Sequence, residues 1–335
     1  MVSGEEQKIL PPLVAKRTYL YTYDEIYSKI VNRIRKRKKL SYLKKMEIVY
    51  NILYDNYSRS LDAIGRLLTE SDEFYIELFR IGFGDNLWSC YRKLRRRLCL
   101  LREIMDTYKL LVLEEPGNSH KYHREAIGRM LSLFKRSRKC ISLLKEFLIT
   151  VSKMPAIDTR LPTLIVSGIP NAGKSTFVRT VSSAEPEVAP YPFTTQEVIV
   201  GHVMLGVHKL QIIDTPGIIE RPDEKRNPIE RQALAALLKI TGGIIFLVDP
   251  TDRAYQDLWH QYRLLQELDE RCKKKILVVI NKIDVAPGHM INKAVELFCS
   301  KYPCEKMCAH NKEYAMNVLR RAYSICYESF NDSNT

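Results

Sequence analysis

Long apolar runs are missing from this chain of 335 residues. No stretch approaches the roughly 18 to 20 apolar residues that a membrane-spanning helix requires, so no span is expected. The first ten residues, MVSGEEQKIL, lack the basic start and apolar core of a signal peptide. Eight cysteines in so long a chain do not resemble the framework of a small secreted domain. We therefore expect reduced thiols and a cytoplasmic or nuclear protein.

Negative charge is scarce in the first half of the chain. Residues 1–160 contain 32 Lys and Arg against 19 Asp and Glu, whereas residues 161–335 contain 21 against 20. The net charge of +14 therefore belongs almost wholly to the first half. Such asymmetry is expected where one domain contacts a polyanion and the other performs chemistry. The alternative is a basic surface that serves only solubility.

Glycine and proline are also rare between residues 23 and 152, which favours helices there. From about residue 85 to 115, apolar residues recur at alternating spacings of four and three, as in a helix packed lengthwise on another. The residues of this seam are Leu87, Tyr91, Leu94, Leu98, Leu101, Met105, Tyr108 and Val112. A further helix is predicted over about residues 120–152. Together these patterns predict an antiparallel helical bundle.

The pattern changes after about residue 154. Short aliphatic runs at 164–166, 212–213, 244–248 and 276–280 alternate with helical segments, which predicts parallel strands covered on both faces. The expected fold class is multidomain α plus α/β: an N-terminal helical bundle, then a domain with a doubly wound, mostly parallel sheet. We place the basic helical domain at residues 1–158 and the second domain at 159–330. In such sheets ligands bind beyond the carboxyl ends of the strands.

A phosphate-loop motif follows the first predicted strand. The sequence GIPNAGKS at residues 168–175 fits the pattern G-x-x-x-x-G-K-S. Its glycines let backbone N–H groups turn toward phosphates, Lys174 reaches the β and γ oxygens, and the Ser175 hydroxyl can bind Mg²⁺. The expected phosphate-binding residues are Asn171, Ala172, Gly173, Lys174, Ser175 and Thr176.

Two further loops have the composition of nucleotide switches. In PYPFTT, at residues 190–195, a threonine can give Mg²⁺ a second hydroxyl ligand when the γ-phosphate is present. We favour Thr195 over Thr194 for this metal contact. In IIDTPGII, at residues 212–219, Asp214 is expected to reach Mg²⁺ through water and the Gly217 N–H to meet the γ-phosphate.

The sequence NKID at residues 281–284 predicts a guanine site. Asp284 can accept from both N1–H and the exocyclic amino group of guanine, and adenine lacks that pair of donors. Asn281 is expected to tie this loop to the phosphate loop, and the Lys282 stem to cover the base. Cys308 and Ala309 stand about where a backbone N–H should meet the guanine carbonyl. The motifs together predict that the second domain, with its doubly wound, mostly parallel sheet, is a P-loop GTPase domain that binds GTP.

The combination of GIPNAGKS, PYPFTT and DTPGI resembles the Obg-related GTPases, and within them the nucleolar GTP-binding protein 1 family. Supporting stretches are FY at 74–75, GRM at 128–130, PAID at 155–158, VGH at 200–202 and RNPIE at 226–230. The resemblance runs from about residue 8 to 325. It implies a protein that binds and hydrolyses GTP on precursors of the large ribosomal subunit, with ribosomal RNA and ribosomal proteins as partners. The chain looks like a compact, archaeal-like member, so a nucleolar location is implied only for a eukaryotic source.

Ile218 stands where small GTPases have a glutamine that orients water. GTPases of the resembled class normally have a hydrophobic residue there, so slow intrinsic hydrolysis is expected, with the missing group supplied from elsewhere. Asn171 matches an asparagine that helps potassium-stimulated relatives hold K⁺ beside the β and γ phosphates; alternatively it only shapes the loop. A group from ribosomal RNA or a ribosomal protein is the other source. Lys174, Thr195 and Asn171 are the candidate catalytic residues.

Clusters of basic residues in the helical half predict contact with RNA, mainly through phosphates. The candidates are Arg33, Arg35, Lys36, Arg37, Arg92, Arg95, Arg96, Lys135, Arg136 and Arg138. A membrane surface fits less well, because these helices lack a free apolar face. The alternatives are a signalling switch that binds a protein effector through the bundle, and a GTP-loaded scaffold that has lost hydrolysis.

Two other groups of residues are not interpreted as sites. Cys299, Cys304, Cys308 and His310 cluster, but at spacings that do not match paired zinc ligands. Asp249 and Asp252 follow an aliphatic strand, and we expect them to cap the next helix.

Overall fold

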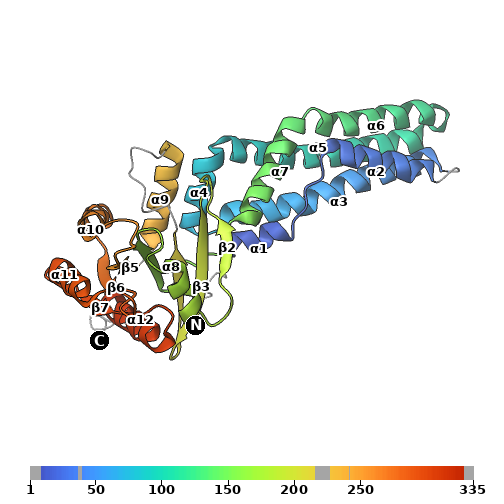
Figure 1. Cartoon of the computed structure of the whole chain (residues 1–335). Coiled ribbons are helices and arrows are strands. Elements are labelled where there is room, and N and C mark those ends of the chain that lie inside the picture. The colour runs from blue at the N-terminus through green and yellow to red at the C-terminus, as the bar shows by residue number, and fades with distance from the viewer. Residues whose placement is uncertain (1–8, 37–39, 216–226, 241, 328–335) are drawn as a thin grey trace, which may run out of the picture. The chain divides into compact units, whose positions relative to one another are not determined.

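The computed structural model describes residues 9–36, 40–215, 227–240 and 242–327. The chain forms two compact units, residues 1–153 and 154–335. Each unit is described by itself below (Figure 1). Within the described residues, every helix is too short or too polar to cross a membrane.

The first unit consists of helices, and its longest helices run antiparallel to one another (Figure 1). They are α1 (Pro11–Lys16), α2 (Tyr23–Arg35), α3 (Tyr42–Thr69), α4 (Glu73–Phe83), α5 (Asn86–Glu114), the short 3-10 helix η1 (Pro116–Asn118), α6 (Ser119–Lys135) and α7 (Arg138–Lys153). Side chains define two of the starts. Thr22 and Glu25 form a capping box at α2, and the Ser41 hydroxyl accepts from the Lys44 N–H at α3.

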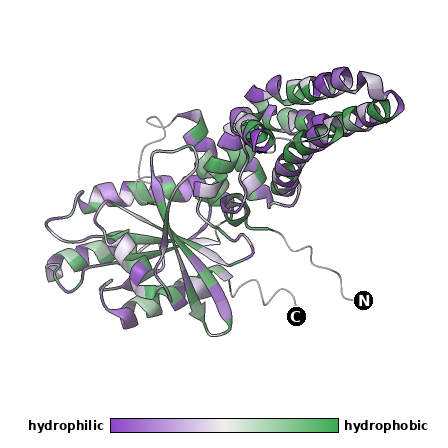
Figure 2. Cartoon of the chain, turned by 90° about the vertical axis from the view of Figure 1, so that its right-hand side faces the viewer, coloured by the Kyte–Doolittle hydropathy of each residue, from purple (hydrophilic) through white to green (hydrophobic). Residues whose placement is uncertain are grey.

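The predicted apolar seam of α5 forms part of the bundle core. Seven of its eight residues are buried, and Tyr91 is half-buried. Across the core, the rings of Tyr57 and Phe134 stack at 4.5 Å between centroids. The bands of apolar residues along these helices are visible in Figure 2. The helical bundle expected from the spacing is therefore confirmed.

The single helix predicted over residues 120–152 is instead two, α6 and α7. The break lies at the buried Ser137, whose hydroxyl donates to the Leu133 carbonyl at 3.0 Å. The Ser137 N–H would bond that carbonyl in a continuous helix, but it donates to Phe134 at 2.9 Å. A serine hydroxyl that competes with the backbone in this way is a local cause of a helix end.

Four of the eight cysteines form disulfides, so the expectation that all are reduced is wrong for this structure. Cys90 on α5 bonds Cys140 on α7, and Cys299 bonds Cys304. Composition cannot reveal the first pair, because its members lie 50 residues apart and meet only when the helices pack. In the parts of the chain that the structure describes, no group of three or more His, Cys, Asp or Glu is arranged to hold a metal ion.

The second unit is a seven-stranded sheet in the order β2-β3-β4-β1-β5-β6-β7. The strands are β1 (Thr163–Gly168), β2 (Glu187–Pro190), β3 (Glu197–Leu205), β4 (His208–Asp214), β5 (Gly243–Val248), β6 (Lys275–Ile280) and β7 (Cys304–Lys306). Among the described strands, β3 pairs in the antiparallel sense with both β2 and β4. The other pairings are parallel, which confirms the predicted α/β class.

Five described helices flank this sheet, and the strands between them are largely apolar (Figures 1 and 2). They are α8 (Lys174–Val181), α9 (Pro228–Ile240), α10 (Leu258–Cys272), α11 (Gly288–Phe298) and α12 (Lys312–Tyr327). All residues of β1 and β5 are buried, as expected for central parallel strands covered on both faces. Asn227 and Glu230 begin α9 with reciprocal side-chain to backbone bonds of 2.8 and 3.0 Å, so residues 227–230 form a helix start.

Candidate functional site

The predicted nucleotide motifs lie at the carboxyl ends of β1, β4 and β6, where this type of sheet binds ligands. The phosphate loop follows β1 and leads into α8. Its backbone enters the left-handed region at Asn171, with φ of 64°, and at Gly173, with φ of 98°. A Cβ on Gly173 would lie 2.4 Å from Nδ2 of Asn281, so only glycine fits there.

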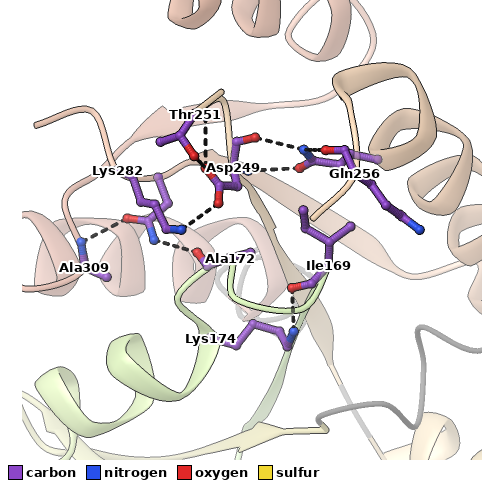
Figure 3. Close-up of polar contacts among 10 residues, drawn as sticks. Ile169, Ala172, Lys174, Asp249, Thr251, Gln256, Lys282 and Ala309 are labelled. Carbon is purple, nitrogen blue, oxygen red and sulfur yellow. Dashed lines mark hydrogen bonds and ion pairs between the residues drawn. The ribbon is translucent and has the colours of Figure 1, made fainter. Parts of the chain in front are cut away.

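Lys174 is folded into the phosphate loop. Its side chain is buried, and Nζ donates to the carbonyl oxygens of Gly168 and Ile169, each at 2.8 Å. Figure 3 shows the contact with Ile169. The ammonium therefore faces the region that the glycine pattern assigns to phosphates. The two carbonyl oxygens hold the ammonium in place, and phosphate oxygens of a bound nucleotide would replace them as acceptors.

Asn281 joins three motifs in one contact set. Its Nδ2 donates to the Ala172 carbonyl at 2.7 Å, and its Oδ1 accepts from the Ala309 N–H at 3.0 Å. Ala172 and Ala309 stand on either side of this buried amide in Figure 3. The sequence predicts the Ala309 N–H as a candidate donor to the guanine carbonyl. In the structure this N–H donates to Asn281. Cys308 is half-buried beside it.

Lys282 has a partner that the sequence did not reveal. Its Nζ lies 2.6 Å from Oδ2 of the buried Asp249, while Oδ1 of Asp249 accepts from Thr251 (Figure 3). The expectation that Asp249 or Asp252 caps the next helix is wrong, since Asp257 caps α10. The pairing of β5 with β6 sets Val248 opposite Ile280, and this register brings the residues that follow, Asp249 and Lys282, to the same edge of the sheet. Asp284 is exposed, with its carboxylate on the surface of the same loop.

Ser175 and Asp214 form the candidate metal position. The Ser175 hydroxyl donates to Oδ2 of Asp214 at 2.6 Å. Oδ1 of Asp214 and Oγ1 of Thr215 are buried and lack a hydrogen-bond partner among the described residues. Burial raises the pKa of the Asp214 carboxyl. A hydroxyl, a buried carboxylate and unsatisfied oxygens are the donor set that Mg²⁺ prefers, so these residues fit that ion.

The first switch loop is anchored next to α9. The buried Tyr191 hydroxyl donates to the Ala233 carbonyl at 2.7 Å. Thr194 closes the loop internally, since its Oγ1 donates to the Tyr191 carbonyl at 2.9 Å. Thr195 is exposed, which leaves it the more accessible of the two threonines. Gly217 and Ile218 lie outside the described residues.

The basic residues predicted to bind RNA do not gather in one patch. Arg33 and Arg35 lie in the last turn of α2, whereas Arg138 bonds Asp24 in the first turn at 2.5 Å. The two ends of this helix are roughly 17 Å apart. Arg95 on α5 pairs with Asp62 at 2.5 Å. The remaining candidates are exposed, namely Lys36, Arg92, Arg96, Lys135 and Arg136, and Arg37 lies outside the described residues.

Taken together, the phosphate loop, the paired Ser175 and Asp214, and the bonds of Asn281 to both loops define a P-loop GTP-binding domain, which follows a helical bundle in the sequence. Comparison with known proteins agrees. Residues 163–282 match the family model of the 50S ribosome-binding GTPase, and residues 19–158 match that of the NOG1 N-terminal helical domain.

Related proteins carry one recurrent name. The chain is 30% identical over 248 residues to nucleolar GTP-binding protein 1 of Caenorhabditis elegans, covering 73% of this chain and 36% of that protein. It is 39% identical over 162 residues to the protein of that name from Encephalitozoon cuniculi, covering 48% and 31%. The chain belongs to the nucleolar GTP-binding protein 1 family.

The shared length differs between relatives. The chain spans about a third of the length of these two nucleolar relatives. An uncharacterized protein of Methanocaldococcus jannaschii is 28% identical over 267 residues, which are 77% of this chain and 75% of that protein.

Proposed function

We propose that the chain binds GTP with Mg²⁺, hydrolyses it slowly, and acts as an assembly factor for the large ribosomal subunit. The Asn281 contact supports this most directly, because it joins the guanine loop to the phosphate loop. A nucleotide that engages both loops is held at its base and its phosphates at once. The ribosomal part of the proposal is supported by the matched family models.

The proposed roles follow from position. Backbone amides at 171–176 and the Lys174 ammonium bind the β and γ phosphates, at the N-terminus of α8. Ser175 and Thr195 would hold Mg²⁺, with Asp214 behind Ser175, and the ion would supply positive charge beside the phosphoryl group. Thr194, Gly217 and the Cys308–Ala309 loop complete the nucleotide contacts. Lys282, held by Asp249, lies along the base.

Base selection is assigned to Asp284 and can be tested by exchanging its chemistry. Wild-type protein should bind GTP far more tightly than ATP. In Asp284→Asn, the side-chain oxygen can still accept from guanine N1–H. The side-chain NH₂, however, would face the guanine amino group, and two donors cannot form a hydrogen bond. Affinity should therefore shift from GTP to xanthosine triphosphate, whose C2 carbonyl accepts. Fluorescent-nucleotide titrations of the wild type and of Asp284→Asn measure these affinities. Equal affinity of the wild type for GTP and ATP would refute the assignment.

Hydrolysis is proposed to depend on K⁺ held partly by Asn171. The left-handed φ of 64° gives a sharp variant, because Asn171→Gly keeps the backbone conformation and removes the side chain. Turnover in K⁺ should exceed turnover in Na⁺ for the wild type, and Asn171→Gly should abolish the difference while retaining GTP affinity. If the two salts give the same rate for the wild type, the activating group comes from the ribosomal partner or hydrolysis has been lost.

Ribosomal RNA is the proposed partner of the basic helical unit. The chain loaded with a GTP analogue should bind large-subunit precursor particles, more weakly with rising salt. GDP should lower that affinity. Salt-insensitive binding to a protein alone would favour the signalling switch instead. The proposed location of the protein is the cytoplasm, or the nucleolus if the source is a eukaryote.

A further inference from the structure

A polar cavity of about 650 Å³ opens in the helical unit, between the segment joining α1 to α2 and the middle of α3. Its volume is that of a small-ligand site. The lining residues that matter here are Arg17, Tyr19, Tyr21, Lys29 and Arg59. They stand apart from the basic clusters recognised in the sequence, because the cavity forms only when the connecting segment packs on α3.

Tyr19 is exposed yet fixed in place. Tyr19 is 54% exposed. Its hydroxyl donates to Glu25 at 2.8 Å and accepts from Lys145 at 3.3 Å. Its carbonyl accepts from the buried Ser60 hydroxyl at 2.8 Å. The ring also meets that of Tyr21 edge-on, 4.6 Å between centroids. An exposed ring held from several directions loses little further freedom when a flat ligand stacks on it.

The charges that line the cavity are mainly positive, although the Tyr19 hydroxyl itself donates to Glu25. Of the residues that the structure describes, Asp55 is the one carboxylate that lines the cavity beside Arg17, Lys29 and Arg59. Lys29 is already placed, with Nζ 3.7 Å from the centroid of Tyr21. Among the described residues, neither Arg17 nor Arg59 has a carboxylate partner in an ion pair. These two guanidinium groups therefore remain available for an anion.

We infer that this cavity binds single-stranded RNA, with a base stacked on Tyr19 and the adjoining phosphate between Arg17 and Arg59. The inference rests on the proposed RNA-binding function and names the place where an unpaired nucleotide is held. An aromatic platform beside cations is the combination that binds single-stranded nucleic acid, since any base can stack and every nucleotide carries a phosphate. An acidic peptide would use the cations but not the exposed ring.

The test uses the full chain and a hexauridylate containing one 4-thiouridine. Tyr19→Leu should weaken binding about tenfold or more in fluorescence anisotropy, whereas Tyr19→Phe keeps the ring and should bind nearly as the wild type does. Arg59→Ala should weaken binding and reduce the salt slope by about one. After irradiation, the cross-linked uridine should map to the peptide that contains Tyr19.

Matched controls lie on α2 and α3, the two helices that flank the cavity. Tyr27→Leu removes another half-exposed ring from α2, and Arg66→Ala removes a cation of α3 that pairs with Glu70 at 3.0 Å. Neither residue lines the cavity, so both variants should bind the hexamer as the wild type does. Equal thermal midpoints and equal GTP affinity show that the fold is intact.

The outcomes separate the two hypotheses. If Tyr19→Leu binds like Tyr27→Leu and the cross-link maps elsewhere, the cavity is not the site, although salt-sensitive binding to ribosomal RNA would leave the proposed function standing. Loss of hexamer binding in Tyr27→Leu to the same extent as in Tyr19→Leu would also overturn the assignment. If the wild type binds neither the hexamer nor ribosomal RNA, both proposals are wrong. Cross-linking at Tyr19 that excess unlabelled hexauridylate prevents, and that an excess of an acidic peptide does not prevent, supports the inference.

Discussion

Replacing Asn281 with alanine should damage both the fold of the nucleotide site and its affinity for GTP. The change removes the 2.7 Å bond to the Ala172 carbonyl and the 3.0 Å bond from the Ala309 N–H, and the amide is almost fully buried. Each buried group left without a partner costs about 1–3 kcal/mol. The free energy of unfolding of this unit should therefore fall by about 2–4 kcal/mol, part of the cost being relieved by water.

Affinity should fall as well, because GTP must then order two loops that the amide no longer joins. A loss of only about 1.4 kcal/mol corresponds to tenfold weaker binding, so we expect at least that factor. Titration with a fluorescent GTP analogue and urea unfolding measure the two effects separately. Asn281→Asp is a second variant that can still accept from Ala309 but sets a carboxylate against the Ala172 carbonyl, and it should bind GTP no better than alanine does.

The control is Asn317→Ala on α12, whose side chain is exposed and accepts only from Arg320 at 2.8 Å. It should leave GTP affinity and stability within experimental error of the wild type. The reasoning would be refuted if Asn281→Ala bound GTP within twofold of the wild type, since the tie between the loops would then contribute nothing to binding.

Three further predictions concern titration and the first switch. Burial raises the pKa of Asp214, so a proton competes with Mg²⁺ for this carboxylate as the pH falls. Affinity for Mg²⁺·GTP should therefore drop on acidification. Asp214→Asn should bind Mg²⁺·GTP weakly and with little pH dependence. Tyr191→Phe loses the buried bond to Ala233, so it should lower the free energy of unfolding by about 1 kcal/mol and speed amide exchange in residues 190–196; unchanged exchange would show that the bond does not anchor the loop. Partial burial opposes ionisation of Glu25, but hydrogen bonds from Thr22, Tyr19 and Lys145 prevail and lower its pKa from 4.5 to about 2. Its contribution to stability is therefore present above pH 4.5 and lost as the pH falls toward 2, and Glu25→Gln should flatten the acid limb of the unfolding profile.

Much of the architecture was predictable because it depends on local periodicity. The seam of α5 repeats with the helical period, and the aliphatic runs of β1, β5 and β6 mark buried parallel strands. The order of strands and loops then places the phosphate and guanine motifs at one edge of the sheet. The break at Ser137 escaped prediction, since the pattern of apolar residues continues through it and only the hydroxyl contact with Leu133 reveals the helix end.

The sequence by itself determined the class of fold, the phosphate loop and the guanine motif, because these are written in neighbouring residues. Only the tertiary structure decided that Lys282 pairs with Asp249, that Cys90 bonds Cys140, and that Tyr19 and Arg59 line the same cavity. Each of these contacts joins residues far apart in the chain. Which of them meet depends on strand register and helix packing, and no local pattern encodes those.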